Sequence, residues 1–184
     1  MPFGFHADKL NTRPRSSTGW YEVTKWRSSA EGSNNLYADE GFDNDSGRYT
    51  VKQPGAYYCF ALARLDGINR SGRSILLIGL NGDIDQTNGL FGIDGNVAST
   101  NYRGMSVAGT LFLKEKDFVS MYVYTDVDNN WQLHDETSMG CHFMNSKIGF
   151  HANLKESRTY ASGWRRIYVR VCTQRIITHA CLPC

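Results

Sequence analysis

The sequence predicts an all-β domain, either a sandwich or a jelly roll, on three observations. Short apolar or aromatic stretches recur between turn residues at about ten-residue spacing, which is typical of these folds. No stretch shows the periodicity of an amphipathic helix. Glycine accounts for 18 of the 184 residues and aromatic residues for 12%, a composition that favours sheets joined by tight turns.

Two apolar runs are expected to form the main strands. Residues 56–65 follow a Pro-Gly turn at 54–55 and are almost continuously apolar. A strand with one solvent-facing side alternates apolar and polar residues, and because this run does not, we expect a central strand buried on both sides. Residues 74–80 form the second run, which is closed by an Asn-Gly pair at 81–82, a strong hairpin signal.

The second half of the chain contains three more expected strands. The runs at 107–113 and 118–124 flank a polar turn at 114–117, and we expect them to pair as a hairpin. A last short strand is expected at 142–144, directly after glycine and cysteine.

Charge and hydropathy exclude some function classes. Residues 1–145 hold thirteen basic and seventeen acidic side chains, a net charge of −4, whereas residues 146–184 hold seven and one, a net charge of +6. The basic residues at the end are spread along an apparent strand rather than gathered on a helix, so we expect no nucleic-acid partner. No run of about eighteen apolar residues predicts a membrane span. The opening residues also lack the apolar stretch of a signal peptide.

An internal repeat suggests how the chain is organised. Gly-Phe-His-Ala stands at 4–7 and again at 149–152, and each copy is followed at a similar distance by Gly-Trp, at 19–20 and 163–164. We therefore expect three parts: a head domain at 1–145, the incomplete start of a second tandem copy at 146–171, and an unmatched cysteine-containing tail at 172–184.

Five cysteines leave at least one without a partner inside the chain. Cys181 and Cys184 form a Cys-x-x-Cys pair, but a zinc site needs four ligands, and only Cys172 and His179 are near. We interpret the cysteines of the tail as incidental.

An ordered series of motifs resembles the globular head of complement component one, subcomponent q, over roughly residues 4–145. The series consists of Phe-Asp at 42–43, Gly-Arg-Tyr-Thr at 47–50, Pro-Gly-Ala-Tyr at 54–57, the segment 111–119 and the closing Ser-Met-Gly at 138–140. The motif residues that we assign a structural role are Phe42, Gly47, Tyr49, Pro54, Gly55, Tyr57, Asp117 and Gly140.

The resemblance implies a ten-stranded jelly roll of two antiparallel sheets that packs as a homotrimer. It also implies a secreted recognition module, not an enzyme, that binds protein, glycan or lipid ligands in an innate-immune or matrix context. Tumour necrosis factor ligands share this fold. The alternatives are a carbohydrate-binding or cytokine-like jelly roll of another family, and a structural matrix element built from tandem heads.

Three positions depart from the family pattern: Cys59, Lys116 in place of a turn glycine, and Ser138 in place of a closing phenylalanine. The resemblance puts Cys59 and Cys141 on neighbouring strands. Either a disulfide or a pair of buried thiols fits there.

Calcium is the one cofactor that we consider. Asp126, Asp128 and Asn130 have the alternating oxygen ligands of a calcium loop, and a polar hairpin loop is the competing interpretation. Some members of the family hold calcium near the trimer axis through an acidic residue that precedes the segment 111–119. The equivalent residues here are Asn101, Tyr102 and Arg103. A cation at Arg103 would repel calcium from this site, and one alternative is that Arg103 itself supplies the positive charge at the axis.

The sequence also contains candidate glycosylation sites and lacks the common catalytic motifs. Asn44 and Asn69 begin Asn-x-Ser triplets in turn-like segments, which are candidate glycosylation sites. The five histidines are scattered, and the sequence contains no nucleophile elbow, zinc-protease motif or phosphate loop.

Overall fold

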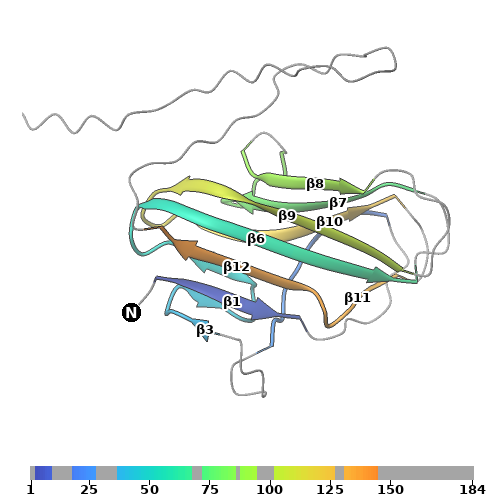
Figure 1. Ribbon diagram of the computed structural model, residues 1–184, viewed down its shortest axis with the longest axis horizontal. Helices are drawn as coiled ribbons and strands as arrows, with labels where there is room; N and C mark the ends of the chain where they lie inside the picture. Colours follow the sequence, from blue (N-terminus) through green and yellow to red (C-terminus); the bar gives the residue numbers. More distant parts are fainter. Residues whose placement is uncertain are drawn as a thin grey trace, which may run out of the picture.

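The computed structural model describes residues 3–9, 18–27, 37–67, 72–85, 88–94, 102–126 and 131–144. All regular structure in these segments is β-strand, arranged as two antiparallel sheets of six strands each that lie face to face (Figure 1). The predicted all-β sandwich is confirmed. The described strands number twelve, where the resemblance implied ten, and three of them have only two residues.

The first sheet is organised around one long strand, β6 (Gly55–Asp66), which pairs with β9 along one edge and with β12 and β11 along the other. Strands β1 and β3 continue the sheet beyond β12 (Figure 1). The other members are β1 (Gly4–Asp8), β3 (Tyr37–Ala38), β9 (Tyr102–Leu113), β11 (Gln132–Leu133) and β12 (Ser138–Phe143).

The second sheet is organised around β10 (Phe118–Thr125), which pairs with β7 along one edge and with β5 and β2 along the other. Its remaining members are β2 (Gly19–Glu22), β4 (Phe42–Asp43), β5 (Arg48–Thr50), β7 (Ser74–Leu80) and β8 (Leu90–Asp94). The Arg48 guanidinium donates hydrogen bonds of 2.9 and 3.1 Å to Glu22 and so links β2 and β5. The same hydrogen bonding lowers the pKa of the Glu22 carboxyl.

The core fills the space between the sheets. In β6 the odd-numbered residues from Tyr57 to Leu65 point inward and are almost fully buried, as the two-residue period of a strand requires. The largest fully buried side chains of the core, which include Trp131, Tyr49, Tyr57 and Phe5, come from both sheets. Burying such side chains drives the folding of the sandwich.

Two of the strand predictions are wrong. Segments 107–113 and 118–124 do not pair, because β9 lies in the first sheet and β10 in the second, so the turn between them crosses from one layer to the other. Strand β6 is also not buried on both sides within the single chain, since Tyr58 and Leu62 are exposed. By contrast, β7 is buried along residues 74–79, as its apolar sequence predicts.

The Asn-Gly signal marks a real turn but not a two-residue hairpin. Asn81 and Gly82 have φ values of 55° and 81°, and Asp83 N–H donates to the Leu80 carbonyl at 2.9 Å, which is the geometry of a primed turn. The chain then continues to β8, which pairs with β7 from Leu90 onward. The turn reverses the chain, and a longer connection completes the hairpin.

The aromatic motif residues close one edge of the sandwich. The Phe42 ring stacks on the Phe5 ring with centroids 4.3 Å apart, and the Tyr49 ring also stacks on Phe5, at 5.0 Å between centroids. The Tyr49 hydroxyl donates to Asp39 at 2.9 Å, and burial raises the pKa of Tyr49 well above its ordinary value. The Tyr57 hydroxyl donates to the Gln53 carbonyl at 2.8 Å, beside Pro54 and Gly55 at the entrance to β6.

The remaining motif residues fix tight approaches of the backbone. Gly47 has a φ of 72°, and a Cβ there would lie 2.3 Å from the Val23 carbonyl oxygen, so only glycine fits. Asp117 accepts hydrogen bonds from Lys114 N–H at 2.7 Å and from the Asn81 side chain at 2.9 Å. It therefore ties the turn between β9 and β10 to the turn after β7.

The predicted second copy at 146–171 and the tail at 172–184 lie outside the described residues.

Candidate recognition surface

The side of the first sheet that points away from the second sheet carries a group of exposed apolar side chains, which we call the outer face. Tyr58 and Leu62 on β6 are 44% and 42% exposed, and Tyr102 and Phe112 on β9 are 62% and 50% exposed. They share one face because β6 and β9 pair in register over their full lengths. Four of the seven large apolar side chains that are exposed among the described residues therefore lie on two adjacent strands.

The middle of the outer face is an aromatic cluster formed by three strands. Phe60 on β6 lies over Gly140 on β12, where a Cβ would come within 2.6 Å of the Phe60 ring. The ring contacts His6 of β1 edge-on at 5.4 Å between centroids, and His142 of β12 stacks on it at 5.7 Å. Glycine at position 140 thus lets a phenylalanine reach across β12 and hold two imidazoles.

The imidazoles of this cluster have distinct surroundings. Partial burial lowers the pKa of His142, and the nearby charge of His6 lowers it further. The Nε2 atom of His6 lies 3.7 Å from the Asp8 carboxylate, which projects from the same side of β1. His142 is therefore neutral at physiological pH, in a mainly apolar setting.

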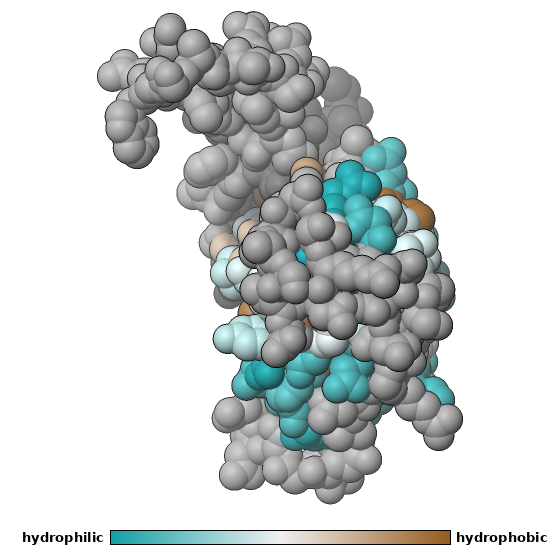
Figure 2. Space-filling model, turned by 90° about the vertical axis from the view of Figure 1, so that its right-hand side faces the viewer, coloured by the Kyte–Doolittle hydropathy of each residue, from teal (hydrophilic) through white to brown (hydrophobic). Residues whose placement is uncertain are grey.

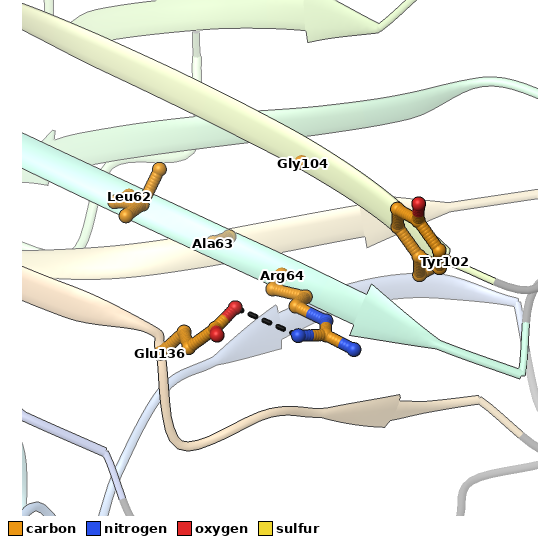
Figure 3. A pocket seen from close by; sticks show the side chains of 6 residues that line it. All are labelled: Leu62, Ala63, Arg64, Tyr102, Gly104 and Glu136. Carbon is orange, nitrogen blue, oxygen red and sulfur yellow. Dashed lines mark hydrogen bonds and ion pairs between the residues drawn. The ribbon is translucent and has the colours of Figure 1, made fainter.

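The charged end of the outer face holds a shallow hollow of about 450 Å³, lined by Leu62, Ala63, Arg64, Tyr102, Gly104 and Glu136 (Figure 3). Arg64 donates to Glu136 at 2.8 Å and to Asp66 at 2.9 Å, and its guanidinium lies 5.2 Å from the Tyr102 ring centroid. Arg64 is thus held between two carboxylates and an aromatic ring.

The outer face is therefore polarised along its strands. Tyr58, Phe60 and Phe112 occupy one end and the middle, whereas Arg64, Asp66 and Glu136 occupy the end at which β6 terminates. Seen from that end of the molecule, the coloured surface is mainly hydrophilic (Figure 2). An apolar centre with charges at its rim is the composition of a protein–protein interface.

The residues considered for calcium are only partly described. Asp126 is exposed at the end of β10, and its carboxylate accepts a hydrogen bond of 2.6 Å from Arg73 N–H. Asp128 and Asn130 lie outside the described residues. In the described part of the chain, no three His, Cys, Asp or Glu side chains are grouped so that they could hold a metal ion.

The axial candidates separate in the structure. Asn101 lies outside the described residues, Tyr102 points out onto the outer face, and Arg103 points between the sheets and is only 3% exposed. The Arg103 guanidinium donates to the Gly72 carbonyl and, at 3.3 Å, to the Ser74 hydroxyl. The exposed side chain of this segment is thus a tyrosine, because neighbouring strand residues point to opposite sides.

Cys59 and Cys141 are directly opposite each other on β6 and β12, and a disulfide joins them with an S–S distance of 2.10 Å. Their Cα atoms are 4.1 Å apart, and both residues are fully buried. The link ties the two central strands of the first sheet together beneath the outer face.

The two glycosylation triplets differ in what the structure describes. Asn44 lies in the turn between β4 and β5, and its carbonyl accepts a hydrogen bond from Trp26 N–H at 2.8 Å. Asn69 lies outside the described residues.

Of the exposed side chains of the outer face, only Tyr102 was a candidate from the sequence, as one of the axial residues. Residues Tyr58, Phe60 and Leu62 lie within the apolar run 56–65, where they were assigned to the core. The sequence signal for this face was that apolar and polar residues do not alternate in the run 56–65. A strand that is apolar on both sides, but that its own chain buries on one side, is typical of an interface. Which alternate residues point outward depends on the pairing of β6 with β9 and β12.

Solved structures with the same fold include the following two. The globular domain of zebrafish complement 1qA protein aligns with a TM-score of 0.50 and 18% identity over 78% of this chain and 98% of that chain. A crystal structure of murine APRIL aligns with a TM-score of 0.55 and 14% identity over 78% of this chain and 100% of that chain. No protein-family model and no curated protein sequence matches. The chain has the complement one-q/tumour necrosis factor-like fold.

Among the described residues there is no helix with the length and apolar character needed to cross a bilayer.

Proposed function

We propose that this chain is an extracellular recognition head that assembles as a homotrimer through the outer face of its first sheet. In this assembly the outer face of each subunit packs against the other subunits. The loops and the remaining surfaces then bind a protein, glycan or lipid ligand, in an innate-immune or matrix context. The chain acts by binding and not by catalysis.

The observation that supports this proposal is the apolar outer face of β6. The strand is apolar on both sides, but the single chain covers only one of them, and Tyr58 and Leu62 stay exposed beside Phe112 of β9. Fully burying an apolar side chain contributes about 1.5–3 kcal/mol. Contiguous exposed apolar side chains with charges at one end mark an interaction surface.

A second copy of the chain is the occupant that fits this surface best. The aromatic cluster and the charged end lie along one strand pair, and the charged end carries both signs, with Arg64 beside Asp66 and Glu136. Such a surface can supply cations and anions to its own copies in a closed assembly. The resemblance to complement-type heads also implies a trimer.

Sedimentation velocity on the full chain tests the assembly, with reactive thiols alkylated so that intermolecular disulfides do not form. We expect the wild type to sediment as a trimer at neutral pH, and Tyr58→Glu to sediment as a monomer, because a buried unpaired carboxylate is costly. Phe91→Glu is the matched control, since Phe91 is 41% exposed but lies on β8 of the second sheet, and we expect it to stay trimeric. A monomeric wild type contradicts the proposal.

Secretion is supported by the disulfide between Cys59 and Cys141, a bond that persists in oxidising compartments.

The ligand is tested by binding of the purified trimer to an immobilised glycan array and to vesicles. Saturable binding to one class identifies the ligand, and competition with the soluble ligand provides the control.

A further inference from the structure

The cluster of His6, Phe60 and His142 is the feature of the outer face that the assembly itself does not explain. An apolar side chain such as Phe60 is common in an interface, but burying apolar surface does not require the two imidazoles that contact its ring. Histidine is the side chain whose charge changes between about pH 5 and 8. Because two histidines lie on the outer face, the charge of this face can change with pH.

We infer that this cluster makes the assembly sensitive to acid, so that the subunits associate at neutral pH and separate at acidic pH. The inference rests on the proposed function, because it concerns the same face and requires the subunits to assemble through it. Each assembled subunit places both imidazoles in the contact between chains.

The charged and titratable groups around the cluster determine how its charge responds to pH. On β1 the carboxylate of Asp8 lies 3.7 Å from the Nε2 atom of His6. On β6 the Tyr58 ring lies 6.4 Å from Phe60. On β9 the residues opposite Phe60 and Tyr58 are Ala108 and Thr110, which do not titrate.

The other nearby charges belong to different contacts. Asp39, which follows β3, accepts hydrogen bonds from Gly4 N–H and from the Tyr49 hydroxyl. Arg64 and Asp66 lie further along β6 and pair with each other. Asp8 is thus the carboxylate that lies beside His6. Protonation of His142 places a positive charge on an imidazole that is already partly buried.

Whether acid favours or opposes association depends on how burial changes the pKa of His142. Burial already lowers the pKa of His142 in the single chain, and covering the outer face removes more water from the same imidazole. The separated chain thus binds the proton more readily than the assembly does. Falling pH consequently favours separation, by up to tenfold in the association constant per histidine per pH unit.

Sedimentation velocity of the full, alkylated chain at pH 7.5 and 5.5 tests the inference. We expect the wild type to be trimeric at pH 7.5 and mainly monomeric at pH 5.5. The double variant His6→Gln/His142→Gln should stay trimeric at both values, and His142→Gln alone should show a shallower dependence on pH. His134→Gln is the control, because His134 contacts Asp135 at 2.6 Å and is not part of the cluster, and it should behave like the wild type.

The outcomes separate this inference from the proposed function. A wild type that stays trimeric at pH 5.5, or a double variant that separates just as the wild type does, overturns the acid sensitivity and leaves the trimer intact. A wild type that is monomeric at pH 7.5 overturns the trimer and the inference with it. If the double variant does not fold, as judged by circular dichroism, His142→Gln alone provides the test, and an unchanged pH dependence then overturns the inference.

Discussion

Strands β6 and β7 have the same kind of sequence but different surroundings. Both are nearly continuous apolar runs, and both lie at the centre of a six-stranded sheet. Strand β7 is buried on both sides from residue 74 to 79, whereas β6 alternates, with Tyr58 and Leu62 exposed between buried neighbours. The apolar residues of β7 are buried within the chain, whereas Tyr58 and Leu62 on the outer side of β6 are exposed, which is why we propose that a partner covers them.

This difference shows how to interpret an apolar strand. A run without alternation indicates that both sides are buried in the functional protein, but not that one chain supplies both covers. Where one apolar side of a strand is exposed in the single chain, that side is the candidate interface. Three measurements test whether β6 and β7 differ in this way.

The largest effect is expected from the disulfide that joins β6 to β12 and has no counterpart at β7. Replacing both Cys59 and Cys141 with alanine removes a link that spans 82 residues, and loop-closure entropy gives a loss of about 4 kcal/mol in the free energy of unfolding. Urea unfolding measures this loss. Mass spectrometry of the non-reduced wild type provides the check, since two alkylatable thiols at positions 59 and 141 would contradict the bond.

The next effect compares the two strands directly. Leu77→Ala on β7 removes a fully buried side chain, and we expect the free energy of unfolding to fall by about 2–5 kcal/mol. Leu62→Ala on β6 is the matched variant, and in dilute monomeric protein it should change stability by less than about 0.5 kcal/mol. Urea unfolding of both variants at the same low concentration tests this. Equal losses would show that β6 and β7 do not differ.

The smallest effect concerns the turn that carries the chain from the first sheet to the second. Lys116 has a φ of 70°, a left-handed conformation that glycine adopts without steric cost. We expect Lys116→Gly to raise the free energy of unfolding by about 0.5–1 kcal/mol. Thermal unfolding measures the change. Lys114→Gly in the same turn is the control and should not stabilise the protein, because Lys114 does not have a positive φ.

Local sequence signals predicted the turns and most of the strands. The Asn-Gly pair at 81–82 forms the expected turn, and Gly47 stands where the backbone requires a residue without a side chain. The departure of Lys116 from the family's glycine was visible in the sequence, and the structure explains it as a strained turn position. These features depend on a few neighbouring residues, and for that reason the sequence carries them.

Pairing across long distances could not be predicted in the same way. The segments 107–113 and 118–124 have the pattern of a hairpin, yet β9 pairs with β6 and β10 with β7. The local hydrogen bonds of the polar turn between them, from Lys114 N–H to the Asp117 carboxylate and from Asp117 N–H to the Lys114 carbonyl, are compatible with either arrangement, whereas its bonds to Val51 and Asn81 come from the tertiary structure. Which sheet each strand joins depends on how the two layers of the sandwich bury their apolar sides.

The sequence by itself determined an all-β sandwich, its main strands and the glycines that its close approaches need, because alternation and turn chemistry are local properties. The tertiary structure alone decided which apolar residues became core and which became surface. Phe60 is apolar like its neighbours in β6, but pairing with β12 sets it over Gly140 between His6 and His142. Only the packing of three strands that are distant in sequence brings these groups onto one face.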